Sequence, residues 1–212
     1  MNRTCFLVDG FNLYHSLRAA SDDLGGASTK WLDLRALLQA FLPALGNRAS
    51  LQRIYYFSAL ANHLEKRQPG LVARHQAYIE CLEHLGIVPV LGRFKPKLIR
   101  CHHCGWESRH FEEKETDVAI SIKLLEIFHG DEADTVALVT GDTDLAPAVR
   151  RSKILFPEKQ VWFLFPYKRR NNELARIADG HCSIRKERYL QHQFPPRMCS
   201  ASGKILRKPE VW

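Results

Sequence analysis

Short apolar runs alternate with helical patterns along almost the whole chain, and this alternation constrains the fold more than any other feature. The runs are rich in β-branched and aromatic residues, as buried strands are. The expected strands are Cys5–Val8, Ile54–Phe57, Ile87–Leu91, Thr135–Val139 and Val161–Phe165. Strands that alternate with helices build βαβ units. The sequence therefore predicts an α/β fold with a mainly parallel sheet and helices on both faces.

Between these runs, apolar residues recur at helical spacing. Asp33 is a plausible N-cap of one such segment, and Gly86 is a typical residue at the end of another. The expected helices are the pattern from Leu32 to Leu42, Leu71–Leu85, Val118–Phe128, Leu145–Leu155 and Asn172–Ala178. Two stretches are expected to be irregular: the Gly/Ser-rich loop Ser21–Lys30 and the basic, Cys/His-containing insert Arg93–Glu113.

The length of 212 residues suits one domain with a full core. We expect the domain to span residues 1–192, with the insert at about 93–113 and an extended tail at 193–212. Apolar residues make up 45% and charged residues 25%, which excludes disorder over the whole length. The apolar runs are far shorter than the roughly 20 residues of a spanning helix. The first residues do not resemble a signal peptide, so the cytosol is the expected compartment.

Charge is distributed unevenly. The net charge is +8. Residues 1–150 hold 17 basic and 18 acidic residues, whereas residues 151–212 hold 14 and 5. A near-neutral body with a basic final third favours a polyanionic partner, nucleic acid first, although many basic proteins bind none. No membrane partner is expected.

Three groups of acids lie where this topology gathers ligands, outside the carboxyl ends of parallel strands. Asp9 follows the first strand, Asp142 and Asp144 follow the strand Thr135–Val139, and Asp117 opens a helix. Carboxylates that share a pocket repel one another unless a cation neutralises them. Oxygen ligands without histidine favour Mg²⁺ or Mn²⁺. The alternative is that Asp117, Asp142 and Asp144 only cap helices.

The motifs around these acids resemble those of NYN-domain proteins. The matching segments are Val8-Asp9-Gly10-Phe11-Asn12, Glu112-Glu113-Lys114-Glu115-Thr116-Asp117-Val118 and Thr140-Gly141-Asp142-Thr143-Asp144-Leu145. Their arrangement is similar to the LabA-like branch of the PIN-like nuclease superfamily. The resemblance runs from about Arg3 to about Tyr189 and implies a PIN-like, Rossmann-like fold.

The resemblance also implies an activity. Asp9, Asp117 and Asp142 would form the acidic metal site, Asp144 would complete it, and Asn12 would support it. The implied activity is metal-dependent phosphodiester hydrolysis, most often of RNA, in single-stranded or structured form. Two alternatives stay open: a non-catalytic RNA-binding or regulatory module on the same fold, and a small-molecule phosphatase. The Asp-x-Asp motif of that phosphatase class belongs at the first strand, where this chain has Asp9-Gly10-Phe11.

Two further segments are candidate binding sites. Lys168, Arg169, Arg170 and Asn171 follow a strand on the same rim as the acids and precede a helix, so they are candidates for phosphate binding. The alternative is a solvated basic loop. Cys101 and Cys104 have the spacing of half a zinc knuckle. The other two ligands would come from nearby histidines or from a homodimer partner, and a free-thiol hairpin is the alternative.

Overall fold

The computed structural model of the protein describes residues 2–100, 102–199 and 203–210, and its centre is a six-stranded parallel sheet. The strands are β1 (Asn2–Asp9), β2 (Ala49–Ser58), β3 (Val88–Leu91), β6 (Thr135–Val139), β7 (Gln160–Phe165) and β8 (Gly180–Ser183). Their order is β3-β2-β1-β6-β7-β8, with every neighbouring pair parallel. The chain thus builds one half of the sheet outward from β1, then returns and builds the other half outward from β6. The predicted α/β fold class is confirmed.

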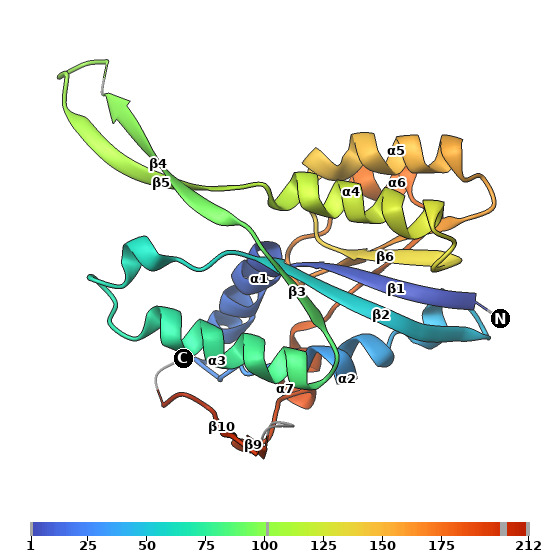
Figure 1. The fold of residues 1–212 in the computed structure, drawn as a ribbon, viewed down its shortest axis with the longest axis horizontal. Helices are drawn as coiled ribbons and strands as arrows, with labels where there is room; N and C mark the ends of the chain where they lie inside the picture. The colour runs from blue at the N-terminus through green and yellow to red at the C-terminus, as the bar shows by residue number, and fades with distance from the viewer. Residues whose placement is uncertain (1, 101, 200–202, 211–212) are drawn as a thin grey trace.

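Helices cover both faces of the sheet (Figure 1). One face carries α1 (Gly10–Asp23), α2 (Leu34–Gln39), α3 (Leu71–His84) and α7 (Lys186–Gln191). The other carries α4 (Thr116–His129), α5 (Ala146–Leu155) and α6 (Asn172–Ile177). Side chains of β1 alternate between the two layers: Phe6 and Val8 pack toward the first group, and Cys5 and Leu7 toward the second. Burial on both faces explains why these strands are continuous apolar runs.

Local signals account for both ends of α2. Asp33 caps α2 by accepting the amide N–H of Ala36 at 2.9 Å. That helix ends at Gln39, earlier than predicted, and a 3₁₀ turn at Leu42–Leu45 follows. Pro43 lies in this turn and has no N–H to continue an α-helix. Two further 3₁₀ turns span Asn62–Leu64 and Thr143–Leu145.

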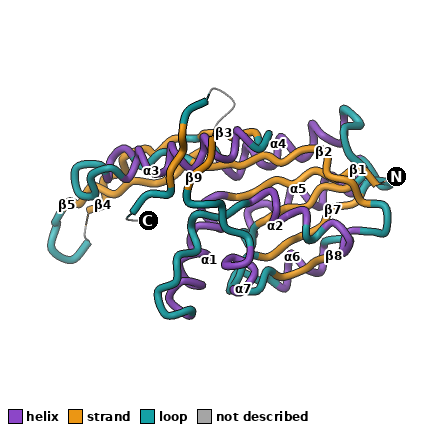
Figure 2. Tube along the Cα trace, turned by 90° about the horizontal axis from the view of Figure 1, so that it is seen from below, coloured by secondary structure: helices purple, strands orange, loops and turns teal. Residues whose placement is uncertain are grey.

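The insert after β3 is regular, contrary to the sequence-based expectation. It forms an antiparallel hairpin of β4 (Arg93–Arg100) and β5 (Glu107–Lys114), which projects from the body as an arm (Figures 1 and 2). Most of its residues are exposed, so neither face imposes the alternation of apolar and polar residues that marks a strand. Cys104 is exposed in the connecting turn, and Cys101 lies outside the described residues.

Other elements were not predicted at all. The helix α1 begins directly after β1 and includes the first residues of the expected loop Ser21–Lys30. After α6 the chain adds β8 and α7. The tail then forms a small hairpin of β9 (Arg197–Cys199) and β10 (Ile205–Arg207), which lies on the body with Leu206 buried. None of the described helices is long and apolar enough to cross a membrane.

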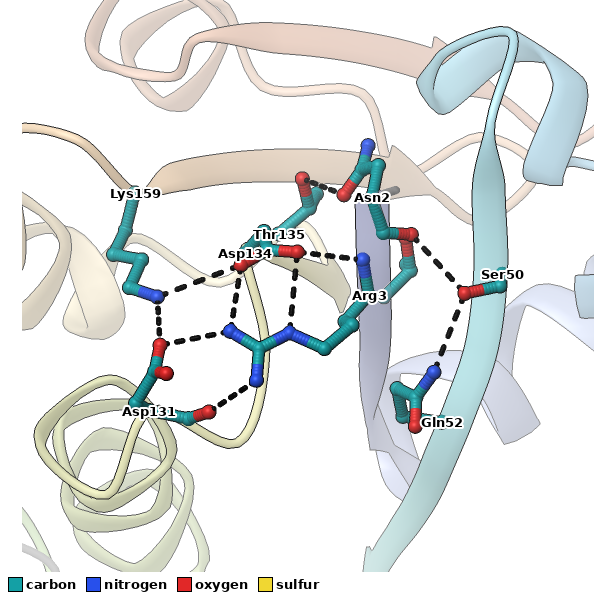
Figure 3. Close-up of polar contacts among 9 residues, drawn as sticks. Asn2, Arg3, Ser50, Gln52, Asp131, Asp134, Thr135 and Lys159 are labelled. Atoms are coloured by element: carbon teal, nitrogen blue, oxygen red, sulfur yellow. Dashed lines mark hydrogen bonds and ion pairs between the residues drawn. The ribbon is translucent and has the colours of Figure 1, made fainter.

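An ion-pair network fastens the amino ends of β1 and β6 (Figure 3). The Arg3 guanidinium contacts Asp131 at 2.8 Å and Asp134 at 2.7 Å. The hydrogen bond from Arg3 lowers the pKa of Asp134 to about 2. Its contribution to folding is therefore present above about pH 4 and is lost as pH falls toward 2. Because the network lies at the amino ends, it stabilises the sheet away from the acids at the carboxyl ends.

Candidate metal centre

Asp9 is the last residue of β1 and the most enclosed of the predicted acids, with 5% of its surface exposed. Its Oδ1 accepts the amide N–H of Asn12 at 2.9 Å, so Asp9 is also the N-cap of α1. Its Oδ2 accepts the hydroxyl of Thr140 at 2.9 Å. Burial raises the pKa of Asp9, while these two hydrogen bonds oppose the rise. The carboxylate is thus held in one orientation by two groups. One is a backbone N–H of α1, which follows β1 in the chain, and the other is a hydroxyl just after β6, which lies beside β1 in the sheet.

Asp117 and Asp142 converge on Asp9. Asp117 lies in the first turn of α4, and Asp142 follows β6. One oxygen from each of the three carboxylates lies within 4.8 Å of the others. We call these three residues the acidic centre. Burial, together with the charges of Asp142 and Asp9, raises the pKa of Asp117 to about 6. The three acids predicted to meet at the sheet edge do meet there.

A frame of hydrogen bonds holds the loop after β6 in place. Thr140 accepts the amide N–H of Asp142 at 3.1 Å, and the Asn12 side-chain oxygen accepts the N–H of Gly141 at 3.1 Å. A Cβ on Gly141 would lie 1.9 Å from the carbonyl oxygen of Arg169, so only glycine fits. Asn12 therefore connects α1 to this loop. Thr140 was missed by the sequence reasoning, although its place directly after a buried strand was a usable signal.

The capping alternative is partly correct for Asp142. Its Oδ1 accepts the amide N–H of Asp144 at 3.0 Å and caps the 3₁₀ turn. Asp117 is not the N-cap of α4, because that position is taken by Glu115. Asp144 is exposed and lies outside the group of three, but its charge still raises the pKa of Asp117.

Glu113 is a further acid beside the acidic centre, and sequence analysis assigns it no role. It lies on β5 and accepts a hydrogen bond from the Thr116 hydroxyl. Burial, together with the charges of Asp9 and Asp117, raises its pKa to about 7. No sequence signal could separate Glu113 from Glu112, whose carboxylate instead pairs with Lys97 and Lys114.

The predicted basic loop follows β7 on the same rim. Its backbone is held by Tyr189, whose hydroxyl accepts the N–H of Tyr167 at 3.1 Å. Lys168 forms an exposed ion pair with Asp23 at 2.5 Å, and Arg170 is exposed. Arg169 lies against Gly141. Asn171 caps α6 through its side-chain oxygen, which accepts the N–H groups of Glu173 and Leu174.

The acidic centre lies between β1 and β6, where the strand order reverses, which is the usual ligand site of open parallel sheets. In the part of the chain that the structure describes, no Lys or Arg forms an ion pair with its three carboxylates. Three converging hard oxygen ligands suit a divalent cation. The fold and site thus define a doubly wound α/β protein with an acidic centre at its ligand-binding edge.

The chain belongs to the NYN-domain family: the model of that family matches residues 3–185. NYN domains are PIN-like nucleases, and the acidic triad lies where the family motifs were recognised. No curated protein matches the chain.

One solved structure has a similar fold, and a second match is more distant. A Vibrio parahaemolyticus RIMD 2210633 protein of unknown function, VPA0982, has a TM-score of 0.54 and 20% identity, over 87% of this chain and 93% of that chain. Staphylococcus aureus MnaA with UDP has a TM-score of 0.39 and 12% identity, over 90% of this chain and 42% of that chain. At these identities the first likeness concerns the fold alone, and the second is too distant to carry an argument.

Proposed function

We propose that the protein is a metal-dependent nuclease of the LabA-like branch that hydrolyses phosphodiester bonds, with single-stranded or structured RNA as substrate. The observation that carries the proposal is the convergence of Asp9, Asp117 and Asp142 within 4.8 Å at the ligand-binding edge of the sheet. Isolated capping residues have no reason to converge in this way. A shared cation removes the repulsion that their convergence creates.

The spacing of the acidic centre suits Mg²⁺ or Mn²⁺. Bonds to Mg²⁺ are about 2.1 Å long, so oxygens that share one ion must lie within a few ångströms of one another. The three oxygens lie within 4.8 Å of one another, and Asp9, Asp117 and Asp142 would together hold such an ion. When bound, such an ion activates water and balances charge that develops on a phosphoryl group.

The surrounding residues orient the acids. Thr140 and the amide of Asn12 leave the Asp9 carboxylate little freedom to rotate. Groups that orient metal ligands typically contribute 10–100-fold to metal affinity or activity. Asp144 and Asn12 support the centre in this account. Glu113 adds a carboxyl that exchanges its proton near neutral pH in the metal-free protein.

The basic loop supports a nucleic-acid substrate. Arg169 lies against Gly141 beside the acidic centre, and its exposed neighbours Lys168 and Arg170 extend the same loop, so the three can meet phosphates of a bound strand. The ion pair of Lys168 with Asp23 is exposed and therefore weak, so a phosphate can replace Asp23. Asn171 holds the helix that follows this loop. We favour RNA over DNA because the family resemblance implies it.

A substrate panel tests the proposal. The purified protein is incubated with single-stranded RNA, duplex RNA, single-stranded DNA and a DNA flap, in Mg²⁺, Mn²⁺ or EDTA. We expect cleavage of single-stranded RNA that EDTA abolishes and that Asp117→Asn reduces at least 100-fold. The matched control is Glu158→Gln, an exposed acid on a distant turn. If no nucleic acid is cut with Mg²⁺, Mn²⁺ or Co²⁺, a non-catalytic RNA-binding module replaces the nuclease.

A further inference from the structure

A cavity of about 570 Å³ lies beside the acidic centre, and we call it the α1–α3 cavity. Its walls come from α1, α3, the end of β2 and the base of the β4–β5 hairpin. Figure 1 shows α1 and α3 on the same side of the sheet, where the arm leaves the body. The volume lies within the roughly 300–1,000 Å³ of small-molecule sites. The cavity therefore has room for a ring system rather than for an ion alone.

The inner wall of the cavity is apolar and aromatic. Leu13 and Leu17 are buried in it, and Phe11 meets Phe94 edge to face at 5.5 Å between ring centroids. A polar pair interrupts this wall: the His75 ring nitrogen Nε2 lies 3.4 Å from the Ser58 hydroxyl. Burial lowers the pKa of His75 and so favours the neutral ring. An apolar wall with a few polar groups suits a flat heteroaromatic ring.

Three cations line the same cavity: Arg18, Lys30 and Arg74. Burial and the charges of Arg18 and Arg74 lower the pKa of Lys30. Among the described residues, no Asp or Glu lines the cavity. Glu65 lies near Arg74, but its carboxylate accepts the N–H groups of Gly70 and Val72. A phosphate would relieve the mutual repulsion of these three cations.

Residues that line the cavity lie next to members of the acidic centre and to Glu113. Gly10 lines the cavity and directly follows Asp9. Phe94 lines it too and pairs across the hairpin with Glu113, so both side chains lie on one face of the arm. Burial raises the pKa of the cavity residue Tyr56 to about 12, with smaller contributions from the charges of Asp9 and Glu113. A ligand in the cavity would thus lie next to the acids.

We propose that the α1–α3 cavity binds one nucleotide of the substrate strand, with its base inside and its phosphate at Arg18, Lys30 and Arg74. This inference rests on the proposed function, because it places a nucleotide beside the bond to be cut. His15 also lines the cavity and lies close to both Arg18 and Arg169. Burial is the largest cause of its lowered pKa, and the charges of these two arginines lower the pKa as well. Cations therefore follow one another from the cavity to the basic loop, as a bound phosphate backbone requires.

Binding of small ligands tests the base site and the phosphate site separately, and it needs no cleavage assay. The full-length protein is titrated in EDTA with the four nucleoside 5′-monophosphates, the parent nucleosides, ribose 5-phosphate and inorganic phosphate, by calorimetry. We expect at least one monophosphate to bind ten times more tightly than its nucleoside and than ribose 5-phosphate, because base and phosphate both contribute. Equal affinity for ribose 5-phosphate and every monophosphate would overturn the base site.

Variants assign the binding to this cavity. Arg18→Ala/Lys30→Ala should weaken the preferred monophosphate about tenfold, and Arg18→Ala alone, at an exposed position, should weaken it in the same direction. The control Arg151→Ala/Arg176→Ala removes equal charge from exposed positions on α5 and α6, which cover the opposite face. Equal loss in the control pair would mean general electrostatic attraction and would overturn the assignment.

Competition between a monophosphate and RNA shows whether the nucleotide site is part of the binding site for the substrate strand. A fluorescent 12-nucleotide single-stranded RNA is bound in EDTA, and the preferred monophosphate is added. Displacement supports the proposal, whereas monophosphate binding without displacement identifies a separate effector site and overturns it. Neither result depends on cleavage. If the protein cuts RNA but binds no monophosphate, the nucleotide site proposed here is wrong and the nuclease proposal stands. If it binds the monophosphate and the RNA but cuts no nucleic acid, the nuclease proposal is wrong and the nucleotide site stands.

Discussion

The hydroxyl of Thr140 donates a hydrogen bond of 2.9 Å to Oδ2 of Asp9, across 131 positions of sequence. The same hydroxyl accepts the amide N–H of Asp142 at 3.1 Å. One side chain therefore connects two members of the acidic centre that come from different strands. Both bonds are formed at the carboxyl ends of β1 and β6, where a shift between these strands would pull the acids apart.

Replacing Thr140 by valine keeps the shape of the side chain and removes the hydroxyl. We expect metal affinity to fall 10–100-fold, as it does when groups that orient ligands are lost. The free energy of unfolding should fall by about 1–3 kcal/mol, because a buried carboxylate oxygen loses its donor. Thr140→Ser keeps the hydroxyl and should retain most of the metal affinity and most of the free energy of unfolding. Calorimetric metal titration and urea unfolding measure the two effects, and an unchanged metal affinity in Thr140→Val would contradict this role.

The substitution Asp142→Asn distinguishes a role of Asp142 in metal binding from a role in the stability of the fold. The asparagine oxygen can still accept the N–H of Asp144, so the 3₁₀ cap survives. Removing one negative charge relieves repulsion, so in EDTA the variant should melt a few degrees higher than the wild type. It should also lose the stabilisation that Mg²⁺ or Mn²⁺ gives the wild type. A sharp fall of the melting temperature in EDTA would instead assign Asp142 a mainly structural role.

Two carboxyls at the acidic centre should make the metal-free protein less stable as pH rises from about 4 to 7. Glu113 and Asp117 have folded-state pKa values raised to about 7 and about 6, so folding favours their protonated forms. Their contribution is present at low pH and is lost as the carboxyls ionise. Both groups are half-buried, and after screening by solvent we expect about 2 kcal/mol in total.

Thermal unfolding in EDTA measures this pH dependence. Between pH 5 and pH 8 the melting temperature of the wild type should fall by roughly 5 °C relative to that of the variant Glu113→Gln/Asp117→Asn, since about 1 kcal/mol shifts a protein of this size by 2–4 °C. The comparison with the variant is needed because the lowered pKa values of His15, His63 and His75 act in the opposite direction in both proteins. The same slope in the wild type and in the variant would show that these carboxyls do not contribute to the pH dependence.

The basic loop should contribute to RNA affinity without sequence preference. Replacing Lys168, Arg169 and Arg170 by alanine removes up to three phosphate contacts. Each contact contributes about 0.7 to the slope of log affinity against log salt for single strands, so the slope should decrease by about 2. Binding measured by fluorescence anisotropy at several salt concentrations gives the slope. An unchanged slope would leave the loop as a solvated surface.

Most of the sheet and the acidic centre can be predicted from the sequence, and the reason is physical. Strands buried on both faces must be apolar, so β1 and β6 were visible, and parallel strands bring their carboxyl ends to one edge. Asp9, Asp117 and Asp142 could therefore be placed together. The family motifs at the same residues agreed with that placement.

The missing parts depend on tertiary contacts. The helix α1 was missed because Asp9 both ends the strand and caps the helix, so no loop separates the two. The sequence does not predict the strands of the arm, because most of its residues are exposed and show no alternation of apolar and polar residues. Its register decides that Glu113, paired with Phe94, faces the centre while Glu112 pairs with Lys97 on the other side. Local sequence carries no information about such a register.

Binding of Mn²⁺, followed by electron paramagnetic resonance, tests the central claim most directly, because it needs neither a substrate nor an assay for cleavage. The wild type should bind one or two Mn²⁺ per chain, the range for one- and two-metal sites. Asp117→Asn should weaken this binding at least tenfold, and Glu158→Gln should leave it unchanged. Equal Mn²⁺ binding by the wild type and Asp117→Asn would contradict the claim that Asp9, Asp117 and Asp142 form one cation site.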